Sequence, residues 1–186
     1  MEKIPHEDLH IVSLTNRHEL NSFNCKSDDL NDFLKTDALE DQEVMVTKTY
    51  LCYWKEKIVG FFSILADTIE VKAIDDVDGV KGYAYPKYPG IKIARLAVDS
   101  EFERRDVGTF LFKAAIGAAM SVSDIIGCRY LTVDSKTDSI AFYKKLQFKI
   151  VKKYNKTENQ KMYIDMYPIV AAMRPKETLD DFLAPS

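Results

Sequence analysis

The sequence predicts a mixed α/β fold in which a mostly antiparallel sheet carries helices on both faces. Three observations predict it. Residues 49–53 and 58–65 are strand-like runs on either side of a polar turn at 55–57, which indicates a hairpin. Residues 91–98 are nearly all apolar, which is typical of a strand in the middle of a sheet. Helical and strand-like patterns then alternate as far as residue 166, as in α/β folds.

The composition indicates one soluble domain. The 186 residues are 46% hydrophobic and 30% charged, which suits a single sizeable core. We expect the domain to cover residues 1–168 and a tail to cover 169–186. No apolar run reaches the roughly 18 residues of a membrane span, and the N-terminus lacks the apolar stretch of a signal peptide. We therefore expect a cytoplasmic protein with no membrane partner.

Cysteine and histidine usage excludes two other classes of protein. The three cysteines are odd in number and far apart, which argues for a reducing compartment and against a disulfide framework. The three histidines lie near the N-terminus without the spacing of zinc ligands. No metal site is expected.

The first half of the chain is expected to supply an edge strand, a helix and the hairpin. Residues 9–14 alternate weakly and predict the first strand. Ser27 is a candidate helix cap, and Asp28 and Asp29 favour the positive end of the helix dipole. Residues 68–73 extend the sheet, whereas 75–90 are expected to form a loop. Apolar residues at helical spacing place one face of that first helix: Leu30, Phe33, Leu34 and Ala38.

The second half is expected to continue with a helix from Gly108 to about Met120 and a buried strand at 130–133. Asp138 is a candidate cap for a further helix, and residues 148–154 and 161–166 predict a closing hairpin. Within the tail, residues 178–183 form one amphipathic turn if they are ordered. The apolar stripes of the two helices consist of Leu111, Ala114, Ala115 and Ala118, and of Ile140, Ala141, Phe142 and Leu146.

Charge is distributed unevenly along the chain. Residues 26–43 carry seven acids and two lysines, whereas residues 143–161 carry seven lysines and one glutamate. The lysine-rich segment fits a phosphate-bearing substrate such as tRNA. It equally fits a solvated surface whose lysines keep an edge strand from pairing.

The segment from Arg95 to Phe112 carries the chemistry. A buried strand ends at Val98, a polar turn follows, and a helix begins around Val107 or Gly108. Unpaired amides and the dipole at such a helix start bind phosphate or diphosphate. Gly108 allows close approach of a ligand, and Arg104 and Arg105 add positive charge. Many strand-turn-helix units nevertheless bind no ligand.

At this segment the chain resembles the GNAT acetyltransferase superfamily. Leu96-Ala97-Val98 matches its Leu-Ala-Val strand, and Glu103-Arg-Arg-Asp106-Val-Gly108 matches its coenzyme A loop, Gln/Arg-x-x-Gly-x-Gly/Ala. Glu103 replaces Gln or Arg, and Asp106 replaces the first glycine, where a left-handed backbone tolerates Asp. The resemblance implies a GNAT-like acyl-CoA acyltransferase fold. It implies that acetyl-CoA is bound by Leu96, Ala97, Val98, Glu103, Arg104, Arg105, Asp106, Val107, Gly108 and Thr109.

A second match covers Asp138-Ser-Ile-Ala-Phe-Tyr143-Lys-Lys-Leu-Gln147-Phe148, where Gln147 replaces the usual glycine. Asp138 stands near an Asn of the family pattern and joins the cofactor-binding set. The resemblance implies that Tyr143 protonates the departing coenzyme A thiolate. The alternative is that Tyr143 packs in the core.

A third match is narrower. The run from Phe23 to Ala38, together with 88–99, resembles toxin-type GNAT enzymes, although Lys26 stands where their pattern has Gly. Those toxins acetylate the amino group of aminoacyl-tRNA and are often paired with a small antitoxin. An antitoxin and a homodimer are therefore partners to test.

We expect an N-acetyltransferase that transfers an acetyl group from acetyl-CoA to a primary amine by direct attack. The amine belongs to a small molecule, a peptide or an aminoacyl-tRNA. Asp99, Glu103 and Asp134 are the candidate bases, and none is singled out. An α-amine titrates near 8 and needs less help than a lysine amine. The alternatives are a degenerate coenzyme A-binding or interaction module, and a nucleic-acid-binding protein without catalysis.

Overall fold

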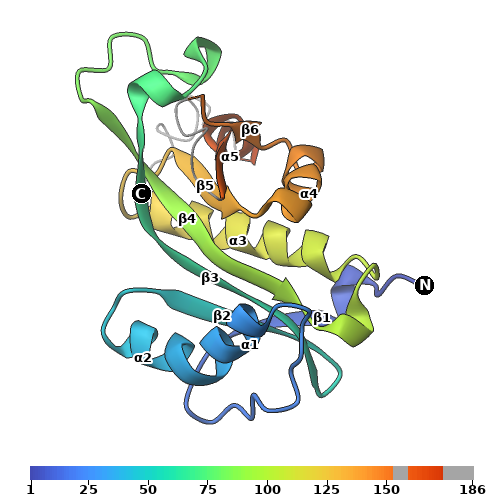
Figure 1. Cartoon of the computed structure of the whole chain (residues 1–186). Helices are drawn as coiled ribbons and strands as arrows, with labels where there is room; N and C mark the ends of the chain where they lie inside the picture. The colour runs from blue at the N-terminus through green and yellow to red at the C-terminus, as the bar shows by residue number, and fades with distance from the viewer. Residues whose placement is uncertain (153–158, 174–186) are drawn as a thin grey trace, which may run out of the picture.

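The computed structural model describes residues 1–152 and 159–173 (Figure 1). One seven-stranded sheet has the strand order β1-β2-β3-β4-β5-β7-β6. Every pair of neighbouring strands is antiparallel except β4 and β5, which are parallel. The strands are β1 (Leu9–Ser13), β2 (Lys48–Trp54), β3 (Lys57–Glu70), β4 (Lys87–Val98), β5 (Tyr130–Ser135), β6 (Lys149–Ile150) and β7 (Gln160–Asp165).

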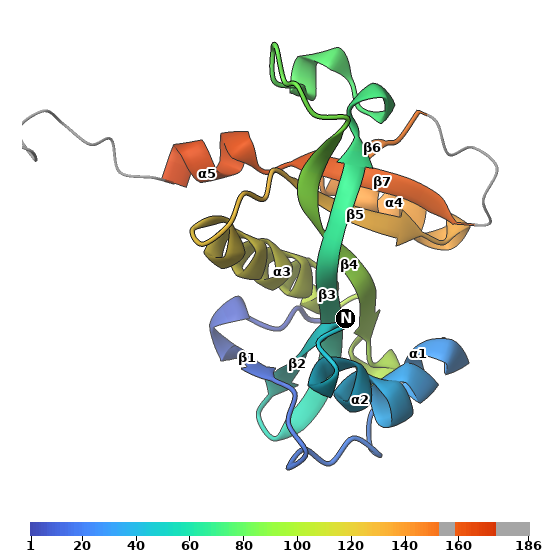
Figure 2. The ribbon, with the colours of Figure 1, turned by 90° about the vertical axis from the view of Figure 1, so that its left-hand side faces the viewer.

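Helices lie on both faces of this sheet, which confirms the predicted fold class (Figure 2). α1 (Asp28–Asp32) and α2 (Ala38–Glu43) are joined by a π-helical segment, Phe33–Asp37. These elements lie on one face, and α3 (Val107–Ser123) lies on the other. The chain also forms α4 (Ile140–Lys145) and α5 (Tyr167–Met173), with short 3-10 helices at His6–Asp8, Val71–Ala73, Asp76–Asp78, Ser100–Phe102 and Thr137–Ser139.

The packing of α3 fixes where its N-terminus lies. Leu111, Ala115 and Ala119 are fully buried at helical spacing and face the core. A Cβ at Gly60 of β3 would lie only 2.8 Å from Leu111 Cδ1 and 2.8 Å from Ala97 O. Because only glycine fits there, α3 can press against β3 beside the end of β4.

The bounds of two strands differ from the predicted ones. β3 runs to Glu70, so the expected extension over 68–73 stops at 70. β4 begins at Lys87, so the last four residues of the expected loop belong to the sheet. The two strands pair from Gly60 with Val98 to Glu70 with Lys87, and this long pairing carries the 71–86 segment away from the rest of the sheet.

The two helix caps are not made as predicted. Ser27 precedes α1, but its side chain makes no capping hydrogen bond; its carbonyl accepts the amides of Leu30 and Asn31 at 3.1 Å. The prediction that Asp138 caps α4 is wrong, since Asp138 lies within a 3-10 helix and Ser139 precedes α4. The extended backbone that suits a capping residue occurs at Lys136, before the 3-10 helix, whereas Ser139 is already helical and makes no capping hydrogen bond.

The C-terminal part of the chain is described only in part. The closing hairpin forms as β6 and β7, but β6 ends at Ile150 instead of 154, and residues 153 and 154 lie outside the described residues. α5 crosses residue 168, where we expect the domain to end, and that boundary stays a prediction. The predicted turn at 178–183 also lies outside the described residues.

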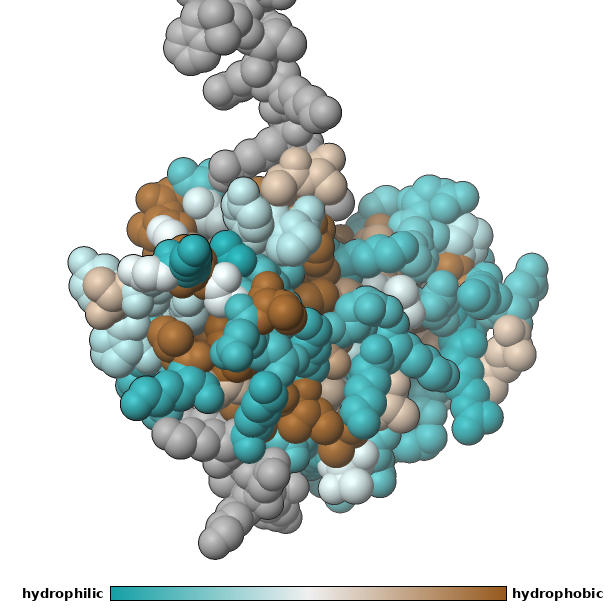
Figure 3. Space-filling view, turned by 90° about the horizontal axis from the view of Figure 1, so that it is seen from above, coloured by the Kyte–Doolittle hydropathy of each residue, from teal (hydrophilic) through white to brown (hydrophobic). Residues whose placement is uncertain are grey.

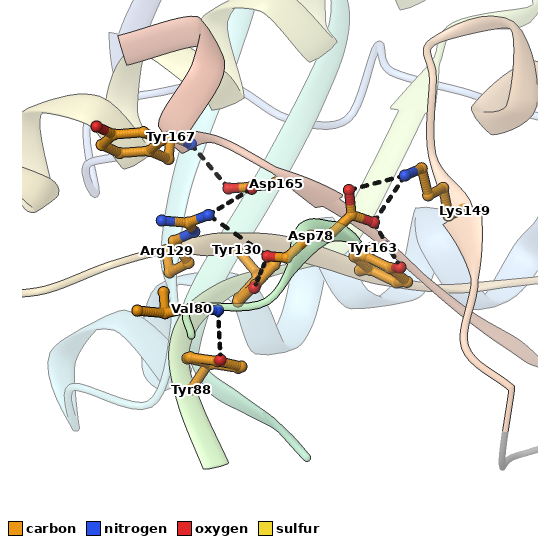
Figure 4. A network of polar contacts seen from close by, with 9 residues as sticks. All are labelled: Asp78, Val80, Tyr88, Arg129, Tyr130, Lys149, Tyr163, Asp165 and Tyr167. Carbon is orange, nitrogen blue, oxygen red and sulfur yellow. Dashed lines mark hydrogen bonds and ion pairs between the residues drawn. The ribbon is translucent and has the colours of Figure 1, made fainter. Parts of the chain in front are cut away.

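A polar network locks the segment 71–86 to the end of the sheet where β4 and β5 pair (Figure 4). The carboxylate of Asp78 accepts from Lys149 Nζ at 2.7 and 2.8 Å and from the hydroxyl of Tyr163 at 2.8 Å. The hydroxyl of Tyr130 donates to the Asp78 carbonyl at 2.6 Å, and Arg129 pairs with Asp165 at 2.7 Å. We call this region, Asp75–Val80 with Arg129, Lys149 and Tyr163, the closed end.

The surface of this region is mixed in character. Figure 3 shows apolar side chains in separate patches among hydrophilic ones when the molecule is seen from above. The exposed apolar residues of the 71–86 segment include Val77, Val80 and Tyr85. Below them, a small buried cluster that includes Ile69, Tyr88, Tyr130 and Tyr163 carries the packing.

Candidate active site

The sheet opens between β4 and β5. The two strands pair only from Gly90 with Tyr130 to Ile93 with Val133. A bulge then follows on β4, because Ser63 faces Arg95 and Ile64 faces Ile93, which leaves Ala94 as the extra residue. From Ala94 to Val98, β4 pairs with β3 but not with β5. We call this part, β4 from Ala94 with the residues around it, the open end.

A cavity of about 480 Å³ occupies the open end. Its walls come from β4, from the end of β5, from α1 on one face of the sheet and from the start of α4. Tyr143 and Leu96 of the predicted site line it. The other polar residues of its lining belong to none of the predicted cofactor or catalytic sets, apart from Asp134 as a candidate base: Asp29, Lys92, Arg95, Asp134, Ser135, Lys136, Ser139 and Asn159.

Two backbone amides of β4 point into the opening. The amide of Asp99 donates to Val59 O of β3 at 3.0 Å. Amides of successive strand residues point to opposite edges, so the amides of Val98 and Leu96 face away from β3. The amide of Ala97 faces β3, and its side chain packs with the cluster beneath α1 and α2. Among the three strand residues, Leu96 and Val98 are thus the ones with donors available to a ligand.

The start of α3 lies beside this edge. A Cβ at Gly108 would lie 3.5 Å from Phe142 Cε2 and 3.7 Å from Val98 Cγ2. The end of β4, the start of α3 and α4 therefore meet at Gly108. Val107, Gly108 and Thr109 occupy the first turn of a 17-residue helix, where amides have no partner within the helix. This geometry suits a diphosphate.

Asp106 takes the left-handed backbone that its position requires, with φ of +70°. Its carboxylate has partners within the protein: Lys3 Nζ and His6 Nε2 each lie 3.6 Å away. A hydrogen bond from Thr109 and the charges of Lys3 and His6 hold the pKa of Asp106 below its usual range. The negative charge of Asp106 is therefore partly offset by Lys3 and His6.

The other three charged residues of the loop, Glu103, Arg104 and Arg105, differ in their contacts and exposure. Glu103 forms an ion pair with Lys26, the residue that replaces glycine in the toxin-type pattern. Arg104 is exposed, with φ of +58°. The guanidinium of Arg105 lies 4.8 Å from the ring of Trp54, and its Nε donates to Glu2 O at 3.1 Å. The side chain of Arg105 is thus engaged by the N-terminal segment and β2.

Tyr143 lines the cavity, and its ring also packs against neighbouring aromatic side chains. It is 6% exposed, and its ring contacts Phe142 and Phe148 at centroid distances of 5.2 and 5.3 Å. Burial raises the pKa of its hydroxyl to about 12. The hydroxyl is therefore protonated at neutral pH and has a proton to donate. Asp138 is exposed, and its neighbour Ser139 lines the cavity instead.

The three candidate bases all have partners. Asp99 is buried, not solvated, and accepts the amides of Asn24 at 2.8 Å and Glu101 at 2.9 Å. Asp134 accepts from Lys92 Nζ at 2.7 Å, and Glu103 pairs with Lys26. Asp99 joins the 24–31 segment to the end of β4, and the geometry singles out none of the three as a base.

The lysine-rich stretch is largely neutralised where it is described. Lys149 pairs with Asp78 at 2.7 Å, Lys152 with Asp75 at 2.7 Å and Lys161 with Asp67 at 3.0 Å. Lys144 and Lys145 are exposed on α4, and Lys153 and Lys156 lie outside the described residues. These lysines therefore serve largely to bind the acids of residues 67–78 to the rest of the fold.

The described residues contain neither a membrane-spanning helix nor a cluster of metal-binding side chains. No helix in residues 1–152 and 159–173 is both long and apolar enough to cross a membrane. In the same ranges, no three His, Cys, Asp or Glu side chains gather in a way that could hold a metal ion.

Comparison with known proteins identifies the family. The model of the acetyltransferase (GNAT) family matches residues 12–148. A tRNA-acetylating toxin of Mycobacterium tuberculosis (strain ATCC 25618 / H37Rv) is 27% identical over 139 residues, which are 74% of this chain and 82% of the toxin.

Solved structures agree on the fold. AtaT complexed with acetyl-methionyl-tRNAfMet aligns with a TM-score of 0.79 at 23% identity, over 90% of this chain and all of that one. A tyrosine-to-phenylalanine mutant of the toxin AtaT, bound to the C-terminus of the antitoxin AtaR and acetyl-CoA, aligns with a TM-score of 0.73 at 21% identity, over 89% and 98%. With the family model covering most of the chain, this protein belongs to the acetyltransferase (GNAT) family and is an acetyl-CoA-dependent N-acetyltransferase.

Proposed function

We propose that this enzyme acetylates the α-amino group of an aminoacyl-tRNA, with acetyl-CoA as donor. The supporting observation is the cavity at the opened sheet, which has lining residues from α1 and from α4. It is lined by Tyr143 and Ser139 at α4 and by Asp29 and Leu30 at α1. A donor reaching the start of α3 and an acceptor entering beside α1 would meet at β4. The relative from Mycobacterium tuberculosis and AtaT point to the same acceptor class.

The donor would be held by backbone groups. The amides of Val107, Gly108 and Thr109 bind the diphosphate, and those of Leu96 and Val98 hold the pantetheine arm and the thioester carbonyl. Glu103, Arg104, Arg105 and Asp106 shape the loop. Because the carboxylates of Glu103 and Asp106 are paired with Lys26 and with Lys3 and His6, they oppose the diphosphate less than free carboxylates would.

The thioester supplies an activated acetyl group to a direct attack. The amine forms the new C–N bond, the C–S bond breaks, and the hydroxyl of Tyr143 donates a hydrogen bond and a proton to the leaving sulfur. The proton lost by the amine passes to solvent, and solvent returns a proton to Tyr143. An α-amine titrates near 8 and an ester lowers that pKa further, so this acceptor needs less help from a base than a lysine amine, and the pairing of Asp99, Glu103 and Asp134 is no obstacle.

The remaining expectations belong to this proposal. We infer that a small antitoxin protein binds the enzyme, as AtaR binds AtaT. The cytoplasmic location and the homodimer stay predictions, as do the roles assigned to Asp138 and the loop residues. The alternative of a degenerate binding module predicts no consumption of thioester.

An acceptor screen tests the proposal. Release of free coenzyme A thiol is followed with charged tRNA, peptides and polyamines as separate acceptors. We expect turnover with charged tRNA and a thermal shift with acetyl-CoA alone, since a ligand that binds only the folded state raises its stability. Turnover with peptides or polyamines but not charged tRNA would contradict the acceptor, and no thermal shift at millimolar acetyl-CoA would favour the binding module.

A further inference from the structure

The cations around the open end fall into two kinds. Lys92 pairs with Asp134 at 2.7 Å, and Lys136 pairs with Asp29 at 3.4 Å. Arg95 also lines the cavity, but it has no carboxylate partner within residues 1–152 and 159–173. Of the three, Arg95 alone keeps its full charge for a ligand.

The side chain of Arg95 is held in place without being neutralised. Its guanidinium lies 5.0 Å from the centre of the Phe33 ring, and its Nη1 donates to Ala94 O at 2.9 Å. Phe33 is buried and stacks on Phe61 at a centroid distance of 6.2 Å, so it is a firm platform. The bulge at Ala94 aims Arg95 at this platform. A guanidinium lying on an aromatic ring keeps its other donors free in one plane, an arrangement suited to a phosphate.

The face of the sheet indicates which substrate would carry that phosphate. Leu96 and Val98 pack against the cluster that includes α3, whereas Ala97 packs beneath α1 and α2. Arg95 shares the α1 side with Ala97, since it lies over Phe33. The donor diphosphate is assigned to the start of α3, on the other face. The phosphate that meets Arg95 therefore belongs to the acceptor.

We propose that Arg95 binds the phosphate next to the aminoacylated nucleoside of the acceptor and thereby distinguishes a nucleotide-linked amine from a free one. This inference rests on the proposed function, because it concerns the acceptor of the same reaction. Arg95 is a specificity-determining residue in this account, and it takes no part in the proton transfers.

A pair of stable acceptors tests the inference. Puromycin carries a free α-amino group on a nucleoside without phosphate, and cytidylyl-puromycin adds the phosphate at the position in question. The wild-type enzyme should have a higher kcat/KM with cytidylyl-puromycin. In Arg95→Ala, kcat/KM for cytidylyl-puromycin should fall about 10- to 100-fold and that for puromycin should change little, as expected for one lost charge-assisted contact.

Two further variants and a salt titration check that the effect comes from the charge of Arg95. Lys35→Ala removes an exposed cation two residues from Phe33 and should alter neither value. Arg95→Lys should restore part of the preference. The salt dependence of KM for charged tRNA should become shallower by about one phosphate contact in Arg95→Ala.

The outcomes separate the inference from the proposed function. Equal losses on both puromycin acceptors, with an unchanged acetyl-CoA dissociation constant, would overturn the role of Arg95 and leave the acceptor class standing. If the wild-type enzyme acetylates neither these acceptors nor charged tRNA, the inference fails together with the proposed function.

Discussion

The two ends of the β4–β5 pair use similar residues for opposite purposes. At the closed end, Lys149 and Arg129 are neutralised by Asp78 and Asp165, and backbone pairing joins the strands. At the open end, pairing with β5 stops at Ile93, Arg95 and Leu96 line the cavity, and the amide of Val98 faces away from β3. The stability of one end allows the other to leave polar groups for substrates.

The closed end has its own cavity, of about 520 Å³, between the start of β4, the end of α3 and α5. Tyr83, Tyr88, Cys128, Arg129 and Tyr167 are among its walls. A cavity of this size could be mistaken for the active site. None of its lining residues belongs to the unpaired stretch of β4, whereas the cavity at the open end is lined by Ala94, Arg95 and Leu96 of that stretch. Variants at the two ends should therefore separate turnover from stability.

The largest expected effect is at Tyr143. Tyr143→Phe removes the proton donor and should lower kcat by about 10²- to 10⁴-fold, the usual range for a general acid. The acetyl-CoA dissociation constant should stay nearly unchanged, because the ring still packs against Phe142 and Phe148. Steady-state thiol release and calorimetric titration measure the two quantities.

A matched tyrosine at the closed end serves as control. Tyr83→Phe removes a hydroxyl that donates to Lys87 O and should leave kcat as it is. If Tyr143→Phe keeps wild-type turnover, Tyr143 is only a packing residue and the acid role is wrong.

The next effect concerns the start of α3. Gly108→Glu should weaken acetyl-CoA binding about 10- to 100-fold, because it places a carboxylate on two methylene groups beside the diphosphate. Gly108→Ala is the matched control, since its Cβ would make only an ordinary contact with Phe142 at 3.5 Å. Titration calorimetry on both variants measures this, and equal affinities for Ala and Glu would contradict the phosphate-loop assignment.

At the closed end, Asp78→Asn should lower stability and spare catalysis. The change leaves Lys149 without its carboxylate and should cost about 1–3 kcal/mol of unfolding free energy. In a protein of this size, that corresponds to a fall in Tm of roughly 2–12 °C. Urea unfolding and turnover below the transition give the two values, with the exposed Asp76→Asn as control. Loss of turnover in the folded variant would mean that the two ends are coupled.

The smallest effect is the pH dependence at Asp106. The folded pKa of Asp106 is lowered, so its contribution to stability is present above the unfolded value of about 3.9 and is lost as pH falls through the folded value. The free energy of unfolding of the wild type should exceed that of Asp106→Asn by less than about 1 kcal/mol at pH 6, and this difference should vanish toward pH 3. Denaturant midpoints at several pH values measure it, and a gap that widens toward low pH would reverse the sign.

Local patterns predicted the fold well and the open end only in part. Apolar residues predicted the central strand and the helix α3. The resemblance singled out Gly108 and Tyr143, which lie in segments that the structure brings to the opening. Whether these residues act as assigned stays a prediction. The left-handed backbone at Asp106 followed from its residue type and the loop pattern.

What the sequence could not supply depends on contacts between distant segments. The pairing of Lys149, Lys152 and Lys161 with acids of 67–78 cannot be inferred from either stretch alone, so the sequence left a phosphate-binding face and a solvated surface as alternatives. The role of Arg95 depends on the bulge at Ala94 and on Phe33, some 60 residues earlier. A π-helical segment and an α-helix bury nearly the same spacing of apolar residues, so Phe33–Asp37 was not distinguished.

A crystal structure of the enzyme with acetyl-CoA tests the account most directly. We predict the diphosphate at the amides of residues 107–109 and the thioester carbonyl oxygen about 3 Å from the Val98 amide. A diphosphate lying instead in the cavity walled by Tyr88, Arg129 and Tyr167, with nothing bound between β4 and β5, would contradict it.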